Sequence, residues 1–101
     1  MRNPLSRRVP FLPILRICVL YEYDESIVHS RDVFRAAVAM NAYAVVLMHS
    51  HPSGDAQPSE ADTRLTKRMA EAGNILQITL LDHVIIVGDG KWFSFKEAGL
   101  I

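Results

Sequence analysis

The stretch Ala44-Val45-Val46-Leu47-Met48-His49-Ser50-His51 decides the fold, because an apolar run leads directly into two histidines one residue apart. A short continuous apolar run is typical of a strand that is buried on both faces of a sheet. Side chains alternate along a strand with a period of two, so His49 and His51 point to the same side. The sequence therefore predicts an inner strand over residues 43–48 whose end presents two imidazoles to one site.

A carboxylate follows at a useful distance along the chain. A loop with Gly54 and two prolines separates the histidines from Ser59-Glu60-Ala61-Asp62, where Ser59 is predicted to be the N-cap of a helix. Asp62 in the first turn of that helix can reach back towards the histidines. Two imidazoles and one carboxylate leave a fourth tetrahedral position to water, as in a hydrolytic zinc site rather than a closed structural one.

Each part of this pattern also has an ordinary structural interpretation. A lone His-x-His at a strand end is more often structural or superficial than metal-binding, and a serine cap with an acid at N3 stabilises any helix start by about 1 kcal/mol. The two interpretations are compatible, because a cap fixes the helix that presents Asp62. We favour metal binding because His49, His51, Ser59 and Asp62 occur in one register.

Composition limits the class of protein. The 101 residues, half of them hydrophobic, are enough for one domain with a single core. Eleven basic and eleven acidic residues cancel, so no overall field attracts the chain to nucleic acid or to an anionic membrane. No apolar run approaches the roughly 20 residues of a membrane span. Arg64, Lys67 and Arg68 form either a solvated helix face or a small phosphate-contacting patch.

The N-terminal part is expected to be irregular. Prolines and arginines alternate over residues 1–13, which we interpret as a leader ahead of a domain spanning 14–101. Its weak likeness to a signal peptide is broken by prolines and Arg16. Cys18 has no other cysteine to pair with and is expected to pack as a small hydrophobe. Together these features favour a cytoplasmic protein.

The remaining elements follow from periodicity and turn residues. We expect a strand over 14–23 at or near a sheet edge, and a helix over 30–41 with an apolar stripe at three-and-four spacing, formed by Val33, Phe34, Ala37 and Val38. A second helix over 59–72 is expected to be closed by Gly73.

The C-terminal part predicts more strands. Two are expected over 75–81 and 84–87, around Asp82-His83, and a turn at 88–90 leads to a hairpin strand at Trp92. The fold class is therefore mixed α/β, with two helices packed on a sheet of about five strands. Asp82 and His83 are either a pair supporting the metal ligands or structural residues, and we leave them outside the catalytic set. Trp92 is expected in the core.

The chain resembles a known family. The spacing His49-Ser50-His51, seven residues, Ser59, two residues, Asp62 is similar to the metal-binding motif of the JAMM (JAB/MPN) metalloprotease superfamily. The wider sequence resembles the RadC branch of that superfamily over about residues 26–101. The stretches that carry this resemblance are Ser26 to Phe34, Asn41 to Asp55, Leu81 to Gly88 and Phe93-Ser94-Phe95.

The resemblance implies a fold similar to that of the cytidine deaminases, and a zinc ion held by His49, His51 and Asp62. It also implies that Ser59 stabilises an oxyanion and that an upstream glutamate is the general base. Family members carry this glutamate a few residues ahead of a Gly-Thr pair, and this chain has no such pair between residues 14 and 26. Glu22 is the candidate base. Glu25 is the fallback, on the opposite face if the strand stays regular.

Two functions of different classes follow. In the first, the protein is a zinc metallopeptidase-like hydrolase of amide or isopeptide bonds in a peptide or protein substrate. In the second, it is a catalytically impaired metal-binding module, associated with DNA repair as the RadC name suggests. The neutral net charge does not support direct DNA binding.

Overall fold

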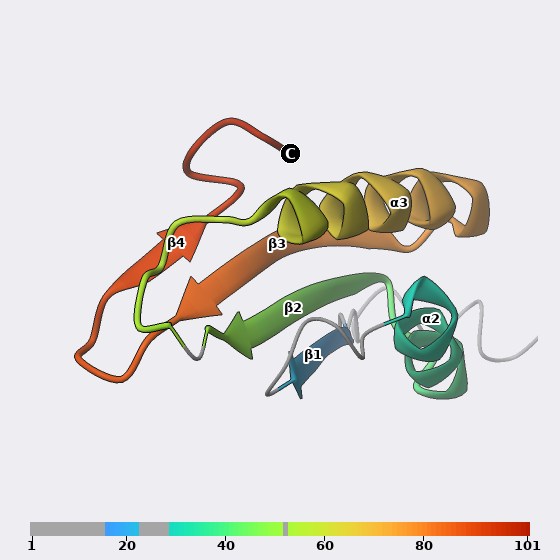
Figure 1. The fold of residues 1–101 in the computed structure, drawn as a ribbon. Helices are drawn as coiled ribbons and strands as arrows, with labels where there is room; N and C mark the ends of the chain where they lie inside the picture. The colour runs from blue at the N-terminus through green and yellow to red at the C-terminus, as the bar shows by residue number, and fades with distance from the viewer. Residues whose placement is uncertain (1–15, 23–28, 52) are drawn as a thin grey trace, which may run out of the picture.

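The computed structural model describes residues 16–22, 29–51 and 53–101, so the predictions for the leader and for Glu25 lie outside the described residues. The described chain forms four strands and two helices (Figure 1). In chain order they are β1 (Ile17–Glu22), α2 (Ser30–Ala39), β2 (Ala44–Ser50), α3 (Glu60–Leu76), β3 (Thr79–Ile86) and β4 (Trp92–Ser94). The mixed α/β class is confirmed, with four strands in the described residues where about five were predicted.

The strands form one sheet in the order β1-β2-β3-β4. The first three are parallel, and β4 pairs with β3 antiparallel, as the predicted hairpin requires. Within the described sheet β1 is an edge strand, whereas β2 lies between β1 and β3 as predicted. Parallel strands place their carboxyl ends at one edge, so the ends of β1, β2 and β3 lie near one another.

β3 is one strand, although the sequence predicted two that separate at Asp82-His83. The Asp82 carboxylate accepts hydrogen bonds from His83 N–H at 2.7 Å, from Ser94 Oγ at 2.6 Å and from Lys96 N–H at 3.0 Å. These bonds satisfy a charged group inside the sheet, so the strand need not break there. Asp82 thereby joins the middle of β3 to the turn after β4.

α3 continues past the predicted end at Ala72. A Cβ added at Gly73 would lie 2.3 Å from the carbonyl oxygen of Ile78, so this glycine permits a close approach of the next segment inside the helix. The helix ends instead at Gln77, which has φ 60° and donates its N–H to the Gly73 carbonyl. The sequence identified the glycine correctly as special but assigned it the wrong role.

Both helices pack on one face of the sheet. The main core cluster joins residues of α2 and α3 to alternate residues of the strands: Cys18, Val33, Phe34, Ala37, Val45, Leu47, Leu65, Met69, Ile78 and Leu80. Cys18 is a free thiol whose pKa is raised by burial, as expected for a cysteine that packs as a hydrophobe. Val38, predicted to belong to the α2 stripe, is instead 60% exposed.

The opposite face of the sheet is more open. Along β1, Ile17, Val19 and Tyr21 are exposed, whereas Cys18 is buried. Along β2, residues 45, 47 and 49 are fully buried, but the residues between them are half-buried. The prediction that β2 is buried on both faces is therefore wrong for the side away from the helices.

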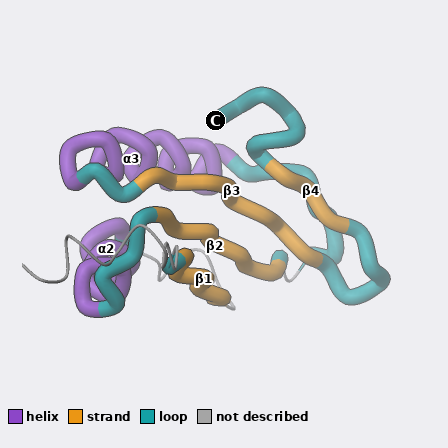
Figure 2. Tube along the Cα trace, turned by 180° about the vertical axis from the view of Figure 1, so that it is seen from behind, coloured by secondary structure: helices purple, strands orange, loops and turns teal. Residues whose placement is uncertain are grey.

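A smaller core cluster closes the end of the sheet beyond β3. The loop between β2 and α3 runs beside β4 (Figures 1 and 2), and Ala56 in this loop packs with Ile85, Val87 and Phe95. Trp92 is 56% exposed, so the expectation that it belongs to the core is wrong. In the described part of the chain, no helix has the length and apolar character needed to cross a membrane.

Candidate metal centre

Three side chains predicted as ligands converge at the carboxyl end of β2. His49 lies near the end of the strand, His51 follows it, and Asp62 is in the first turn of α3. His49 Nε2 lies 2.7 Å from Asp62 Oδ1, and His51 Nε2 lies 2.8 Å from Asp62 Oδ2. The three ligand atoms lie within 4.8 Å of one another, and His49 and Asp62 are fully buried. The structure thus brings together the two imidazoles and the carboxylate.

A capping box holds Asp62 in place. Ser59 Oγ accepts a hydrogen bond from Asp62 N–H at 3.1 Å, and Asp62 Oδ2 accepts one from Ser59 N–H at 2.7 Å. These two bonds stabilise the helix start and fix the orientation of the carboxylate. The structural and the functional interpretations of Ser59 and Asp62 are therefore both compatible with the same geometry.

The position of His51 fixes which of its ring nitrogens carries hydrogen. His51 Nδ1 lies 2.8 Å from the carbonyl oxygen of Asp55. A carbonyl can only accept, so Nδ1 must donate and therefore carries the hydrogen. In the neutral ring Nε2 then has a lone pair, and it is this atom that faces Asp62. A hydrogen bond of this kind at the far nitrogen is typical of histidines that bind metals.

His49 contacts a third histidine that was left outside the predicted catalytic set. His83 Nε2 lies 3.0 Å from His49 Nδ1, and its own Nδ1 is in hydrogen-bond distance of Thr66 Oγ1. Burial, together with the nearby His49, lowers the pKa of His83 to about 4. Sequence reasoning missed Thr66 altogether. Its signal was its position one helical turn after Asp62 in the predicted helix, which places it on the same side of that helix.

The donor set fits a divalent metal. Neutral imidazole nitrogens and a carboxylate are ligands that zinc prefers. A tetrahedral ion bound at 2.0–2.2 Å holds its ligand atoms about 3.4 Å apart, so His49 and His51 need only small outward movements from Asp62. A metal ion between a ring lone pair and a carboxylate oxygen also removes the repulsion between two acceptor atoms. In the metal-free protein a proton can serve the same purpose.

Glu22, the candidate base, lies next to His49 in the sheet. The last pair in the β1–β2 register joins these two residues. Cys18 and Leu20 face the helices, so Glu22 lies on the same side by alternation, and His49 shares that side with Val45 and Leu47. Glu22 is not a member of the three-residue ligand cluster. A general base takes a proton from water and need not be a metal ligand, so this position is compatible with that role.

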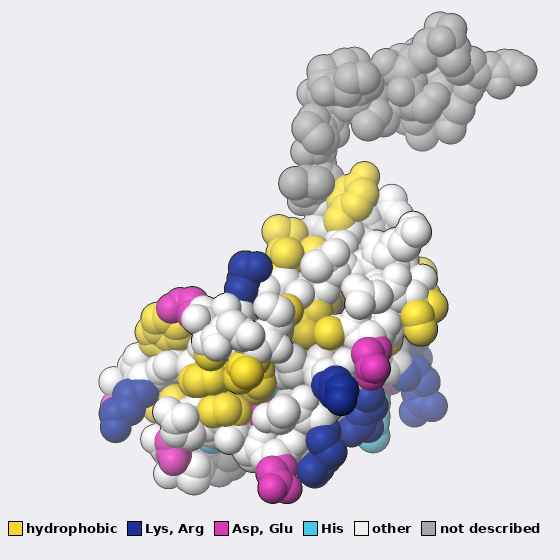
Figure 3. All heavy atoms as spheres, turned by 90° about the horizontal axis from the view of Figure 1, so that it is seen from above, with side chains coloured by type: hydrophobic (Ala, Val, Ile, Leu, Met, Phe, Trp, Pro, Cys, Tyr) yellow, Lys and Arg dark blue, Asp and Glu magenta, His cyan; other side chains and the backbone are white. Residues whose placement is uncertain are grey.

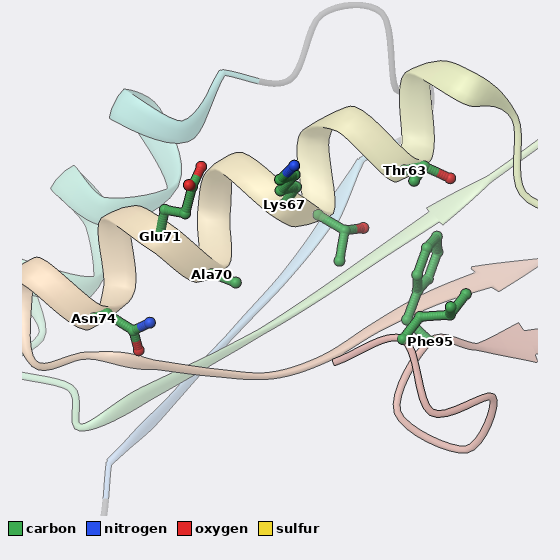
Figure 4. A pocket seen from close by; sticks show the side chains of 8 residues that line it. Thr63, Lys67, Ala70, Glu71, Asn74 and Phe95 are labelled. Carbon is green, nitrogen blue, oxygen red and sulfur yellow. The ribbon is translucent and has the colours of Figure 1, made fainter.

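A groove lies between α3 and the C-terminal segment of the chain. It has a volume of about 280 Å³ and is lined by Thr63, Thr66, Lys67, Ala70, Glu71, Asn74, Phe95 and Leu100 (Figure 4). Phe95 forms one wall and stacks on His83 with ring centroids 4.7 Å apart and planes 7° apart. The groove therefore adjoins the residues that support His49, while its other wall is the middle of α3.

The basic residues of α3 are accompanied by acids. Lysine and arginine side chains gather in one area of the surface beside acidic side chains (Figure 3). Arg64, Lys67 and Arg68 share a shallow depression with Glu71, and Arg64 lies 3.7 Å from the Glu60 carboxylate. Such mixed charge is typical of a solvated helix face and gives no continuous positive stripe.

Comparisons with known proteins agree with this geometry. The family model of the RadC-like JAB domain matches residues 21–100. The chain belongs to this family. Its relatives include UPF0758 proteins of Caldanaerobacter subterraneus, at 58% identity over 76 residues, of Listeria monocytogenes, at 57% over 76 residues, and of Chlorobaculum tepidum, at 50% over 76 residues. Each match covers 75% of this chain.

The matched segment is only part of each of those relatives. The matched segment covers 32% of the Caldanaerobacter protein and 34% of each of the other two. The present chain thus spans about a third of the length of the relatives. The family match includes both helices, strands β2, β3 and β4, the end of β1 and the His49-His51-Asp62 cluster.

Proposed function

We propose that this RadC-like JAB domain is a zinc-dependent hydrolase of amide or isopeptide bonds in a peptide or protein substrate. The observation that carries the proposal is the convergence of His49, His51 and Asp62, whose ligand atoms lie within 4.8 Å of one another and of which His49 and Asp62 are buried. A set of three protein ligands with a fourth position for water is the arrangement of catalytic zinc sites. When bound, zinc supplies a Lewis acid and lowers the pKa of water towards neutrality.

Four residues have defined roles in this proposal, three as ligands and one as the base. His49 and His51 present Nε2, and Asp62 presents a carboxylate oxygen whose orientation is fixed by the Ser59 amide. Glu22 takes a proton from the attacking water and returns it to the leaving amine, as a general base and then a general acid. The register of β1 beside β2 supports this role, because it sets Glu22 level with His49 on the same face.

Ser59 is proposed to stabilise the oxyanion of the tetrahedral intermediate. Ser59 Oγ accepts a hydrogen bond from Asp62 N–H, so its own hydroxyl hydrogen points away from that amide. A hydroxyl donor held by a helix cap beside the ligands needs little reorganisation during the reaction. Loss of one such donor typically costs 10²–10³-fold in kcat.

The proposal is tested by hydrolysis of a mixed peptide library, with cleavage followed by mass spectrometry. We expect cleavage by the zinc-loaded protein, and loss of it after chelation or in Asp62→Asn. Asp89→Asn, an exposed acid in the turn before β4, is the matched control and should be as active as the wild type. Binding of zinc without any cleavage of peptides or isopeptide-linked proteins would overturn the hydrolase proposal. The domain would then be a metal-binding module.

A further inference from the structure

We propose that His83 is a positioning residue which, together with Thr66, holds the His49 ring in the tautomer that turns the Nε2 lone pair towards the metal. The inference rests on the proposed metal site, because the tautomer has a use only if Nε2 is a ligand. It assigns a role to two buried polar residues that the catalytic scheme above does not use.

Thr66 determines which atom donates in its hydrogen bond with His83. Its hydroxyl lies 2.8 Å from the carbonyl oxygen of Asp62, one turn earlier in α3. A carbonyl only accepts, so the single hydroxyl hydrogen of Thr66 is donated there. Thr66 Oγ1 therefore meets His83 Nδ1 as an acceptor, and His83 Nδ1 must carry a hydrogen.

His83 in turn determines which atom donates in its hydrogen bond with His49. The ring is fully buried, and loss of solvent disfavours the charged form of an imidazole, so the ring is neutral. A neutral imidazole that donates from Nδ1 accepts at Nε2. His49 Nδ1, which lies 3.0 Å from that atom, must therefore be the donor.

The result at His49 is a defined tautomer. With its hydrogen on Nδ1, the neutral ring carries a lone pair on Nε2, the atom that lies 2.7 Å from Asp62 Oδ1. His51 reaches the same tautomer through the Asp55 carbonyl. His51 is thus oriented by a backbone carbonyl in the loop before α3. His49 is oriented by the side chains of His83 in β3 and Thr66 in α3. Outer contacts of this kind fix ring orientation and tautomer in metal sites.

Packing keeps the His83 ring from turning over. Phe95 stacks on it in parallel at 4.7 Å, and the His49 ring lies at 4.8 Å on another side. Phe95 is itself 1% exposed and packs against Phe93 edge to face. A ring flip would exchange Nδ1 and a carbon atom and would require these side chains to separate.

The sharpest test uses a pair of substitutions at Thr66. Thr66→Val removes the acceptor at nearly constant volume, whereas Thr66→Ser retains the hydroxyl. Without the acceptor, His83 can move its hydrogen to Nε2, and His49 must then accept at Nδ1 and carry hydrogen on Nε2. We expect nitrogen NMR of histidine-labelled, metal-free protein at about pH 8, above the ordinary histidine pKa, to show this change in Thr66→Val but not in Thr66→Ser.

Zinc affinity is the second readout. We expect Thr66→Val and His83→Phe to weaken zinc binding by about 10–100-fold, with Thr66→Ser close to the wild type. The melting temperature and circular dichroism of each variant show whether it is folded. If His83→Phe does not fold, the Thr66 pair decides alone.

Two results would overturn the inference. One is a wild-type His49 whose Nδ1 carries no hydrogen in the metal-free protein, and the other is a Thr66→Val variant with unchanged hydrogen on His49 Nδ1 and unchanged zinc affinity. The tautomer readout needs neither metal nor turnover. A wild-type protein that shows the expected tautomer but cleaves no substrate would therefore contradict the proposed function and leave the role of His83 standing.

Discussion

The two faces of the sheet differ in burial and in chemistry. On the face covered by α2 and α3, alternate residues of the strands are buried, and they include His49 and His83 as well as the core. On the other face, Val19 and Tyr21 are more than half exposed. Every residue proposed to act in the strands lies on the helix side. The candidate site is therefore an extension of the core, and its geometry depends on the packing that folds the domain.

The largest effect that separates the two faces should come from truncating Leu47. Leu47 is fully buried against the helices, so Leu47→Ala should lower the free energy of unfolding by about 2–5 kcal/mol through lost burial and a residual cavity. Val46→Ala, on the half-buried face one residue earlier, is the control and should cost about 1 kcal/mol. Urea denaturation of the two variants measures both values, and equal losses would contradict the assignment of the faces.

The buried His83 predicts a dependence of stability on pH. Its pKa is about 4 in the folded protein, below the ordinary value near 6.5, so the unfolded chain takes up the proton first as the pH falls. The contribution of neutral His83 to the free energy of unfolding is fully present above about pH 6.5. This contribution falls by about 3 kcal/mol as the pH decreases to about 4.

Urea denaturation of the metal-free protein across this range tests the assignment. His83→Phe should flatten the dependence, whereas His29→Gln, at an exposed histidine, should leave it unchanged. A pH dependence of the same size in His83→Phe and in the wild type would contradict the assignment to His83.

Glu22 tests whether the helix side also carries the base. Glu22→Gln should retain zinc and reduce hydrolysis by at least about 10²-fold, because general-base assistance is typically worth that much or more. Tyr21→Phe, on the exposed side of the same strand, is the matched control and should keep full activity. Unchanged turnover in Glu22→Gln would remove Glu22 from the mechanism without affecting the metal site.

The smallest effect is expected on the open face. Val19 is 58% exposed, so Val19→Ser should change the free energy of unfolding by no more than about 0.5 kcal/mol. Cys18→Ser, at the neighbouring buried position, should cost more, because it places a hydroxyl among apolar side chains. A large loss in Val19→Ser would mean that the face is covered in solution.

Local patterns in the sequence predicted much of the site. The apolar run before His49 indicated an inner strand, and Ser59 with Asp62 indicated a helix start, so the three ligand candidates could be named before the fold was known. Backbone geometry places residues two apart, such as His49 and His51, on the same side of a strand. It also brings residues three apart, such as Ser59 and Asp62, together at a helix start. These local rules do not depend on the rest of the chain.

The remainder depends on contacts between distant segments. The role of Gly73 is set by the Ile78 carbonyl after the helix end, and the continuity of β3 is set by bonds from Asp82 to Ser94 and Lys96. Thr66 and His83 are 17 residues apart and meet only once α3 packs beside β3. Periodicity within one element carries no information on such pairings.

The central claim is that His49, His51 and Asp62 bind one zinc ion, and X-ray absorption at the zinc edge of the metal-loaded protein tests it most directly. We predict one zinc per chain, with nitrogen and oxygen ligands at about 2.0–2.2 Å, two of them imidazoles, and no sulfur at about 2.3 Å. His51→Ala should lose the imidazole signal of one ligand together with most of the affinity. A protein that takes up no zinc at neutral pH, or a spectrum without imidazole scattering, would contradict the account.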